Sequence, residues 1–421
     1  MRVRFTAWHA YPLFDARDSA CVGGAETRAW LLATGLAQRP GFEIDFVVHT
    51  PRRFQEQRCG AISVCNIGDP WDAWRNNVAR SLTITRDPLR IRFHKWDWRL
   101  LWQAPLLSVQ RLASGPPSAP DVPAAIYFER QADVECCFGV SAQSAAVVEA
   151  ARRNNAISIL SLASNSDLDA RFTSDSMYVT VHGERGDVCR RALDGATKII
   201  CQHTEQQRLL KERFGRDGVV LPNPIDLAEW DRAATPPSQL VGSLAGQRFA
   251  LWVGRADDFH KRPLLCLELA RRLPRARFVM VLNPGDELIE RAVRTEKPNN
   301  VLIVPSVPFA EMPMLLSASA VYVSTGSREY EGSPNLFLQA AASRIPIASL
   351  DVSTPLIAGT GAGFVANGDV DQLAKYVGTM IADPGAARAA GEAGRRFVER
   401  EHSQLAIVDR LIELLNASRT A

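Results

Sequence analysis

Two cations follow an apolar segment in the second half of the sequence. Gly254 ends the expected strand Phe249–Gly254, Arg255 comes next, and Lys261 stands six residues further on, where a helical pattern begins. In open parallel sheets, ligands bind beyond the carboxyl ends of the strands. Arginine can bind a diphosphate bidentately, and lysine adds a point charge. The pattern predicts a diphosphate site, although two solvated loop cations would give the same sequence.

A polar turn that begins at Glu331 also follows an expected strand. Gly332 and Pro334 favour a turn, and the apolar run from Leu336 onward favours a helix that enters the core. Such a turn can present backbone N–H groups to an anion or a hydroxyl, and Glu331 at its mouth could accept hydrogen bonds from sugar hydroxyls. Gln339 lies eight residues later, about two helical turns, so we expect it on nearly the same side. An ordinary helix N-terminus with an acidic residue is the alternative.

A third turn, Gly23 and Gly24, precedes the helical pattern that runs to about Ala37. A glycine pair allows the backbone to approach a phosphate or a sugar closely. The dinucleotide fingerprint G-x-G-x-x-G is absent at this turn, which counts against a nicotinamide enzyme, and the chain has no P-loop pattern.

The order of these segments resembles glycosyltransferase family 4, a retaining family with the GT-B fold. The segments are Gly-Gly-Ala-Glu from residue 23, Leu-Pro-Asn-Pro-Ile-Asp from 221, Val-Gly-Arg from 253 with its later lysine, Glu-Gly-x-Pro from 331 and Ile-Pro-Ile from 345. The resemblance covers the whole chain except about residues 69–120. It implies transfer of a sugar from a nucleotide diphosphate donor to a hydroxyl of a glycan or a lipid-linked glycan, with the leaving phosphate taking the acceptor proton.

The resemblance also implies roles for individual residues. Arg255 and Lys261 would hold the donor diphosphate, Glu331 would contact the donor sugar, and the Gly23-Gly24 turn would close over the phosphates or the acceptor. The remaining donor-binding positions are Gly254, Gly332, Ser333, Asn335, Leu336 and Gln339.

Two positions stay open. The family has a second glutamate, on the nucleotide ribose, where this chain has Gln339, and an uncharged amide there leaves the nucleotide preference undecided. Other members place a histidine of the first domain near the donor sugar, and His182 is the candidate here. Glu129 and Arg130, after an expected strand 124–128, are rival cleft residues, and a packed or surface histidine is the plain alternative for His182.

Three functions remain in view from the sequence. The first is a retaining hexosyltransferase that needs neither a metal nor a cofactor besides its nucleotide sugar, because the chain shows no His/Cys cluster. The second is a sugar-nucleotide epimerase with the same fold. The third is a catalytically silent homologue that acts as a binding subunit, which Gln339 would favour.

Alternating strands and helices predict an α/β protein with two Rossmann-like, doubly wound domains across a cleft. We place the acceptor-side domain at residues 1–228 and the nucleotide-sugar domain at 229–400, with a polar linker near 233–242. The amphipathic helix in 401–421 should pack back toward the first domain. Expected strands of the first domain are 3–8, 42–49, 124–128, 157–163, 198–202 and 219–221. Those of the second are 249–254, 278–283, 301–305, 321–324 and 346–350.

Composition sets the compartment and the partners. Of 421 residues, 46% are hydrophobic and 23% charged, and the net charge of +3 gives no reason to expect nucleic acid. The eight cysteines show no metal-ligand spacing, and no secretion signal or membrane-length apolar run is seen. We therefore expect a cytoplasmic protein, or one attached to the membrane only from its cytosolic face.

The segment 69–120 interrupts the α/β rhythm. Five of the nine tryptophans lie in it, and residues 71–111 hold eight basic and three acidic residues, a local excess of five positive charges. Tryptophan with arginine suits an anionic membrane interface, so residues 71–102 are candidates for peripheral contact. The alternative is that these tryptophans pack as a lid on the first domain.

Overall fold

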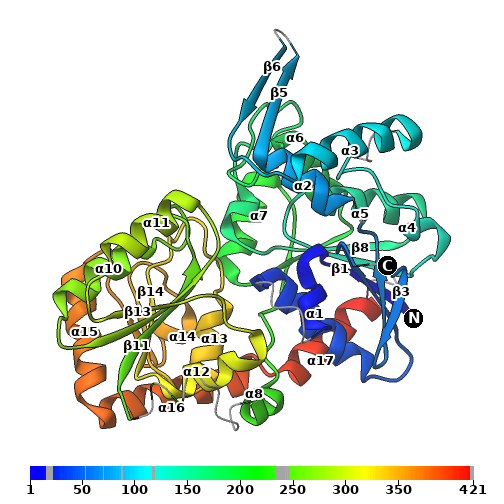
Figure 1. Cartoon of the computed structure of the whole chain (residues 1–421). Helices are drawn as coiled ribbons and strands as arrows, with labels where there is room; N and C mark the ends of the chain where they lie inside the picture. Colours follow the sequence, from blue (N-terminus) through cyan, green and yellow to red (C-terminus); the bar gives the residue numbers. More distant parts are fainter. Residues whose placement is uncertain are drawn as a thin grey trace.

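The computed structural model forms two α/β domains that face each other (Figure 1). It describes residues 1–15, 22–52, 54–69, 71–86, 89–115, 119–233, 242, 244 and 246–417. None of the described helices is long and apolar enough to cross a lipid bilayer. The expected linker 233–242 and Cys21 fall almost wholly outside these residues.

An eight-stranded sheet forms the first domain, in the order β10-β9-β8-β7-β1-β2-β4-β3, and only β3 runs antiparallel to its neighbour. Its strands are β1 (Arg2–Thr6), β2 (Glu43–Val48), β3 (Glu56–Cys59), β4 (Ile62–Asn66), β7 (Val134–Phe138), β8 (Ile157–Ser161), β9 (Lys198–Cys201) and β10 (Val219–Val220). The helices are η1 (Trp8–Leu13), α1 (Gly24–Ala37), α4 (Ile126–Glu129), α5 (Ala142–Arg153), η2 (Asn165–Leu168), α6 (Gly186–Gly195) and α7 (Thr204–Phe214).

The second domain has a six-stranded parallel sheet in the order β13-β12-β11-β14-β15-β16. The strands are β11 (Phe249–Arg255), β12 (Arg277–Asn283), β13 (Val301–Val304), β14 (Val321–Ser324), β15 (Ile347–Ser349) and β16 (Gly363–Val365). This is the doubly wound order of a Rossmann sheet, in which the strand order reverses between β11 and β14. A ligand site is expected at the carboxyl ends of these two strands.

Helices cover both faces of the second sheet. They are α8 (Leu227–Ala233), α10 (Pro263–Arg272), α11 (Glu287–Glu296), η3 (Phe309–Glu311), α12 (Met312–Ala318), α13 (Asn335–Ala342), α14 (Pro355–Ala358), α15 (Val370–Ala382) and α16 (Pro384–Glu401). Strand β11 is buried on both sides, since Leu251 joins the cluster under α12 and α13, while Trp252 joins the cluster under α10 and α15. Trp230 of α8 also packs in the first of these clusters, so the core of the second domain begins before the expected linker 233–242.

The last helix, α17 (Gln404–Ala417), returns to the first domain and lies against α1 (Figure 1). Val408 and Leu411 join the core cluster that contains Leu36 of α1. The amide of Gln404 donates to the carbonyl of Leu31 at 2.7 Å. The chain therefore crosses between the domains twice, once before α8 and once after α16.

The structure corrects one expected strand. Residues 124–128 enter the short helix α4, and the strand at this place in the sheet is β7, Val134–Phe138. The segment 69–120 contains α2 (Asp72–Ser81), the hairpin β5 (Leu82–Arg86) and β6 (Leu89–Phe93), and α3 (Leu100–Ser114).

Candidate active site

A tight loop after β11 places the two predicted cations. The buried carboxylate of Asp257 accepts hydrogen bonds from the backbone N–H groups of His260 and Lys261, at 2.9 and 2.7 Å. The other oxygen of Asp257 lies 3.1 Å from Nε of Arg255. One carboxylate therefore fixes both the course of the loop and the direction of Arg255, whose side chain stays 46% exposed.

Arg262 secures the same loop from its far end. Its backbone is left-handed, at φ 50°, and its guanidinium donates to the carbonyls of Thr325 and Gly326 at 2.7 Å each. The hydroxyl of Thr325 accepts from the indole of Trp252 at 2.9 Å and donates to the carbonyl of Lys261 at 2.7 Å. The loops after β11 and β14 thus form one braced unit at the point where the strand order reverses.

Glu331 lies inside this unit and is buried, whereas the sequence suggested a residue at the mouth. The ammonium of Lys261 forms a salt bridge with Oε1 of Glu331, and Nε2 of His260 lies 3.1 Å from the same oxygen, outside hydrogen-bonding geometry. Burial would raise the pKa of the Glu331 carboxyl, but the positive charge of Lys261 and the nearby His260 lower it to about 2. Glu331 is therefore an ionised carboxylate in a largely dry setting.

The turn after Glu331 lies against the first domain. The backbone N–H of Ser333 donates to the side chain of Gln202 at 3.2 Å, and its carbonyl accepts from Asn223 at 3.0 Å. Asn223 also donates to the side chain of Asn335 at 2.8 Å, and Asn335 donates to the carbonyl of Gly24 at 2.9 Å. The predicted Gly23-Gly24 turn therefore contacts the predicted turn that begins at Glu331, so the two domains are in a closed arrangement.

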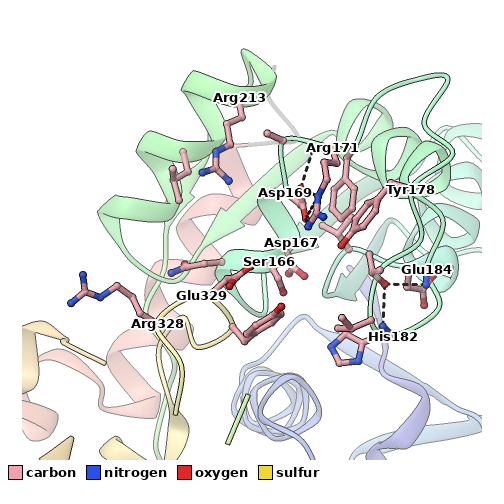
Figure 2. Close-up of a pocket in the computed structure, with 18 residues that line it drawn as sticks. Ser166, Asp167, Asp169, Arg171, Tyr178, His182, Glu184, Arg213, Arg328 and Glu329 are labelled. Carbon is pink, nitrogen blue, oxygen red and sulfur yellow. Dashed lines mark hydrogen bonds and ion pairs between the residues drawn. The ribbon is translucent and has the colours of Figure 1, made fainter. Parts of the chain in front are cut away.

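Beside this contact lies a cavity of about 520 Å³ between the first domain and the loop that precedes Glu331 (Figure 2). The guanidinium of Arg171 lies 3.8 Å from the ring centre of Tyr178 and is paired with Asp169. Arg213 of α7 and Arg328 of the second domain line the same cavity from different sides. Neither has a carboxylate within salt-bridge distance among the described residues.

His182 lines this cavity where it approaches the donor loop. Its ring centre is 5.9 Å from that of Phe259, which lies between Arg255 and His260 in sequence. Partial burial, and next the nearby Arg255 and His260, lower the pKa of His182 below its ordinary value, which favours the neutral ring. The structure thus brings His182 near the cations that the sequence singled out.

Gln339 lies elsewhere than expected. Helix α13 begins at Asn335 and not at Glu331, so helical periodicity does not relate Glu331 to Gln339. Glu331 faces the loop after β11, while Gln339 lines a second cavity, of about 330 Å³, together with Trp30 of α1 and Phe309 of η3. Of the other predicted donor-binding residues, Gly332 lies against Gln202 of the first domain. Leu336 packs against the core of the second domain.

The rival cleft residues are excluded by their surroundings. Arg130 forms salt bridges with Asp45 of β2, at 3.0 Å, and with Glu56 of β3, at 2.8 Å, and Glu129 is exposed on α4. Arg130 precedes β7, so it belongs to the amino-terminal edge of the parallel strands, and the cleft lies at the other edge. Our interpretation of Glu129 and Arg130 as cleft residues was wrong because it rested on the strand 124–128.

Sequence reasoning missed Asp257, His260, Gln202 and Asn223. The first two stand between the two cations, so an acidic residue and a histidine directly after the strand were a usable signal. Gln202 and Asn223 reach the site only because the domains close. Among the described residues, no three His, Cys, Asp or Glu side chains gather as metal ligands.

Comparisons with known proteins agree with this architecture. Residues 247–383 match the family model of the group 1 glycosyl transferases. No curated protein sequence matches the chain. Sucrose-phosphate synthase from Thermosynechococcus elongatus is similar in structure, with a TM-score of 0.70 and 16% identity over 99% of this chain and 98% of that one.

Two further solved structures are similar over nearly their whole length. The α,α-trehalose-phosphate synthase of Burkholderia xenovorans, in complex with glucose-6-phosphate, has a TM-score of 0.67 and 11% identity over 99% of both chains. HepE of Anabaena, in complex with UDP and glucose, has a TM-score of 0.64 and 14% identity over 99% of this chain and all of that one. The protein therefore has the GT-B fold, and its second domain matches the group 1 glycosyl transferases.

Proposed function

We propose that the protein is a retaining glycosyltransferase that moves a sugar from a nucleotide diphosphate donor to a hydroxyl acceptor without a metal ion. The observation that carries the proposal is the placement of Arg255 and Lys261 after β11, against Glu331 after β14. Two cations at the strand-order reversal of a Rossmann sheet suit a diphosphate. The group 1 match of residues 247–383 includes all three residues.

The cations would act on the leaving group. As the bond from the sugar C1 to the phosphate oxygen breaks, negative charge grows on the diphosphate, and each well-placed donor contributes about 3 kcal/mol to the transition state. The acceptor oxygen bonds to C1 on the same face, and its proton passes to the leaving phosphate oxygen. Lys261 has three N–H donors, so it can bind a phosphate without releasing Glu331. Glu331 keeps that ammonium in place and adjoins the sugar.

The acceptor would enter the cavity of Figure 2. Tyr178 and Tyr330 provide aromatic faces, and Asp169 and Glu329 provide hydroxyl acceptors, which together suit a carbohydrate. Glycans and lipid-linked glycans both fit this chemistry. Arg213 and Arg328 favour an acceptor that also carries a phosphate or a carboxylate. Asp167 is buried with a pKa of about 6, but it caps η2 and holds the N–H of Ala163, so we assign it a structural role.

The nucleoside would lie toward the second cavity. Gln339 stands at the position where the family contacts the ribose, and its neighbours Trp30 and Phe309 offer rings to a base. The amide can still accept a hydrogen bond from a ribose hydroxyl, but it carries no charge.

A ligand panel tests the proposal. We expect one of the UDP-, GDP- or ADP-sugars to raise the melting temperature, since a ligand at 100 times its Kd stabilises by about 2.7 kcal/mol. Arg255→Ala should abolish both this shift and transfer, while Arg277→Ala, at the other end of the neighbouring strand β12, should leave both unchanged. A normal shift in Arg255→Ala, or no shift with any of the three donors, contradicts the proposal.

Incubation of the donor with and without an acceptor distinguishes two rival functions. Incubation of the donor without an acceptor yields an epimerised sugar nucleotide if the protein is an epimerase. Donor binding without turnover on any acceptor indicates a silent homologue, which Gln339 favours. In that case Gln339→Glu, which restores the family's carboxylate, is the variant to assay for a gain of turnover.

A further inference from the structure

The tryptophans of the segment 69–120 divide into two sets. Trp71, Trp74 and Trp102 pack on one another edge to face, with ring centres 4.8 and 4.7 Å apart, and they join α2 to α3. These three rings are partly buried and pack on one another, as the lid interpretation requires. Trp96 and Trp98 differ, because 66% and 67% of their surfaces are exposed. The lid interpretation therefore accounts for only the first set.

The exposed rings belong to a larger apolar surface. Fifteen large hydrophobic side chains are exposed among the described residues, and seven of them fall within residues 93–112. We call these seven the outer apolar surface: Phe93, Trp96, Trp98, Leu101, Leu106, Val109 and Leu112. Their concentration in 20 residues of sequence, with four of them on helix α3, makes this segment the candidate for an interaction site, since scattered single residues need no such explanation.

Helix α3 explains part of this surface. Leu101, Pro105, Val109 and Leu112 are spaced by four, four and three residues, so they share one face of the helix. Gln103, on the opposite face of the helix, is buried, and Trp102, at the flank of the stripe, packs on Trp74. The helix thus carries an outward apolar stripe that nothing among the described residues covers.

Basic residues outnumber acidic ones around this surface. Residues 88–120 contain five basic residues, Arg90, Arg92, Lys95, Arg99 and Arg111, against the single acid Asp97. Arg99 is paired with Asp97 at 2.8 Å, whereas Arg92, Lys95 and Arg111 form no salt bridge among the described residues. A protein partner would need an apolar surface and negative charge in the same place. An anionic bilayer provides both, since its acyl chains are apolar and its headgroups are negatively charged.

The segment also projects from the molecule. Figure 1 shows the hairpin β5–β6 extending away from both sheets, on the side of the first domain remote from α17. Rings at the foot of a projecting element can enter the headgroup region of a bilayer while the domains remain outside. Tryptophan beside lysine and arginine is the composition of membrane–water interfaces.

We propose that the outer apolar surface docks the protein on an anionic lipid bilayer. The rings of Trp96 and Trp98 and the stripe of α3 enter the interface, and Arg92, Lys95 and Arg111 contact the anionic headgroups. This docking does not depend on the proposed transfer reaction, because it uses none of the residues around Arg255. It can hold or fail whatever the catalytic assays give.

Vesicle flotation with the purified full chain tests the docking. We expect binding to phosphatidylcholine vesicles that contain phosphatidylglycerol, weaker binding to phosphatidylcholine alone, and loss of binding as salt is raised. The variant Trp96→Ser/Trp98→Ser/Leu101→Ser should reduce binding at least about tenfold, since three interfacial side chains are lost. The matched control Leu288→Ser/Leu405→Ser removes two exposed leucines elsewhere and should bind like the wild type.

Three results would overturn the docking. One is the absence of binding to the anionic vesicles. Another is unchanged binding by the triple variant, whose melting temperature should stay close to that of the wild type because its side chains are exposed. A third is a dimer in sedimentation that the triple variant dissociates, because the surface would then be an interface between two copies of the chain.

Discussion

Lys261 and Glu331 stand 70 residues apart in the chain and form a salt bridge between the loops after β11 and β14. The two loops flank the strand-order reversal of the second sheet. The salt bridge therefore joins the two loops at the point where a ligand is expected to bind. Both side chains are mostly buried, at 22% and 9% exposure. The cation that we propose for the diphosphate is thus also the partner that keeps a buried carboxylate ionised.

The first prediction separates these two roles of Lys261. Lys261→Met should lower the free energy of unfolding by about 3 kcal/mol, because it leaves a buried carboxylate without its partner. The double variant Lys261→Met/Glu331→Gln removes both charges and should recover most of that stability. Neither variant should transfer sugar. Urea unfolding and a transfer assay on the same preparations give both quantities.

The outcome against this prediction is specific. If the double variant is no more stable than Lys261→Met, the two side chains are not energetically coupled. If Lys261→Met keeps normal transfer, Lys261 has no role with the diphosphate. The control Lys211→Met changes an exposed lysine on α7 that is paired with Asp217 and should alter neither quantity.

The second prediction concerns acid. The pKa of Glu331 falls from 4.5 to about 2 on folding, so the folded protein holds its proton less tightly than the unfolded chain. The stability from this group is therefore fully present above pH 4.5 and is lost as the pH falls toward 2. The wild type should lose more stability between pH 5 and 3 than the Lys261→Met/Glu331→Gln variant. Equal losses in urea titrations at the two pH values would contradict the assignment.

The third prediction concerns the contact between the domains. A Cβ atom on Gly332 would come within 2.6 Å of Oε1 of Gln202 and 2.9 Å of Nε2 of Gln206. Gly332→Ala should therefore hold the domains apart, increase the radius of gyration in small-angle scattering and reduce kcat/KM, while the melting temperature changes little. Gly332→Ala/Gln202→Ala makes room and should recover part of the closure. An unchanged radius of gyration in the single variant would show that the turn yields instead.

Much of the second domain follows from its sequence. Its strands are continuous apolar runs, as expected for a parallel sheet covered on both faces, and their carboxyl ends locate Arg255 and Glu331. The strand 124–128 failed because it is a short apolar run, which periodicity alone does not distinguish from a helix. Such a segment is assigned by its tertiary neighbours, here the core under α5 that Tyr127 joins.

What the sequence cannot give is the relation between distant segments. The buried position of Glu331 depends on a lysine 70 residues away, and the contact of Gln202 with Ser333 depends on domain closure. The separation of Glu331 from Gln339 depends on one fact, that α13 begins at Asn335. The apolar run from Leu336 located this helix within one residue, but Glu331 lies before it, so helical spacing could not relate the two side chains. Gln339 lines the second cavity, while Glu331 packs against Lys261.

The last prediction concerns the acceptor. Arg213 and Arg328 reach the cavity of Figure 2 from different domains, and their charges have no carboxylate partner among the described residues. If they bind an anionic group, Arg213→Ala and Arg328→Ala should each raise KM for a phosphorylated acceptor about tenfold, since a charge-assisted hydrogen bond is worth about 1.5–3 kcal/mol. Neither variant should change KM for a neutral acceptor or for the donor. Arg208→Ala, on the same helix as Arg213 but outside the cavity, is the matched control. Equal effects on neutral and phosphorylated acceptors would mean that the two guanidinium groups shape the cavity without recognising an anion.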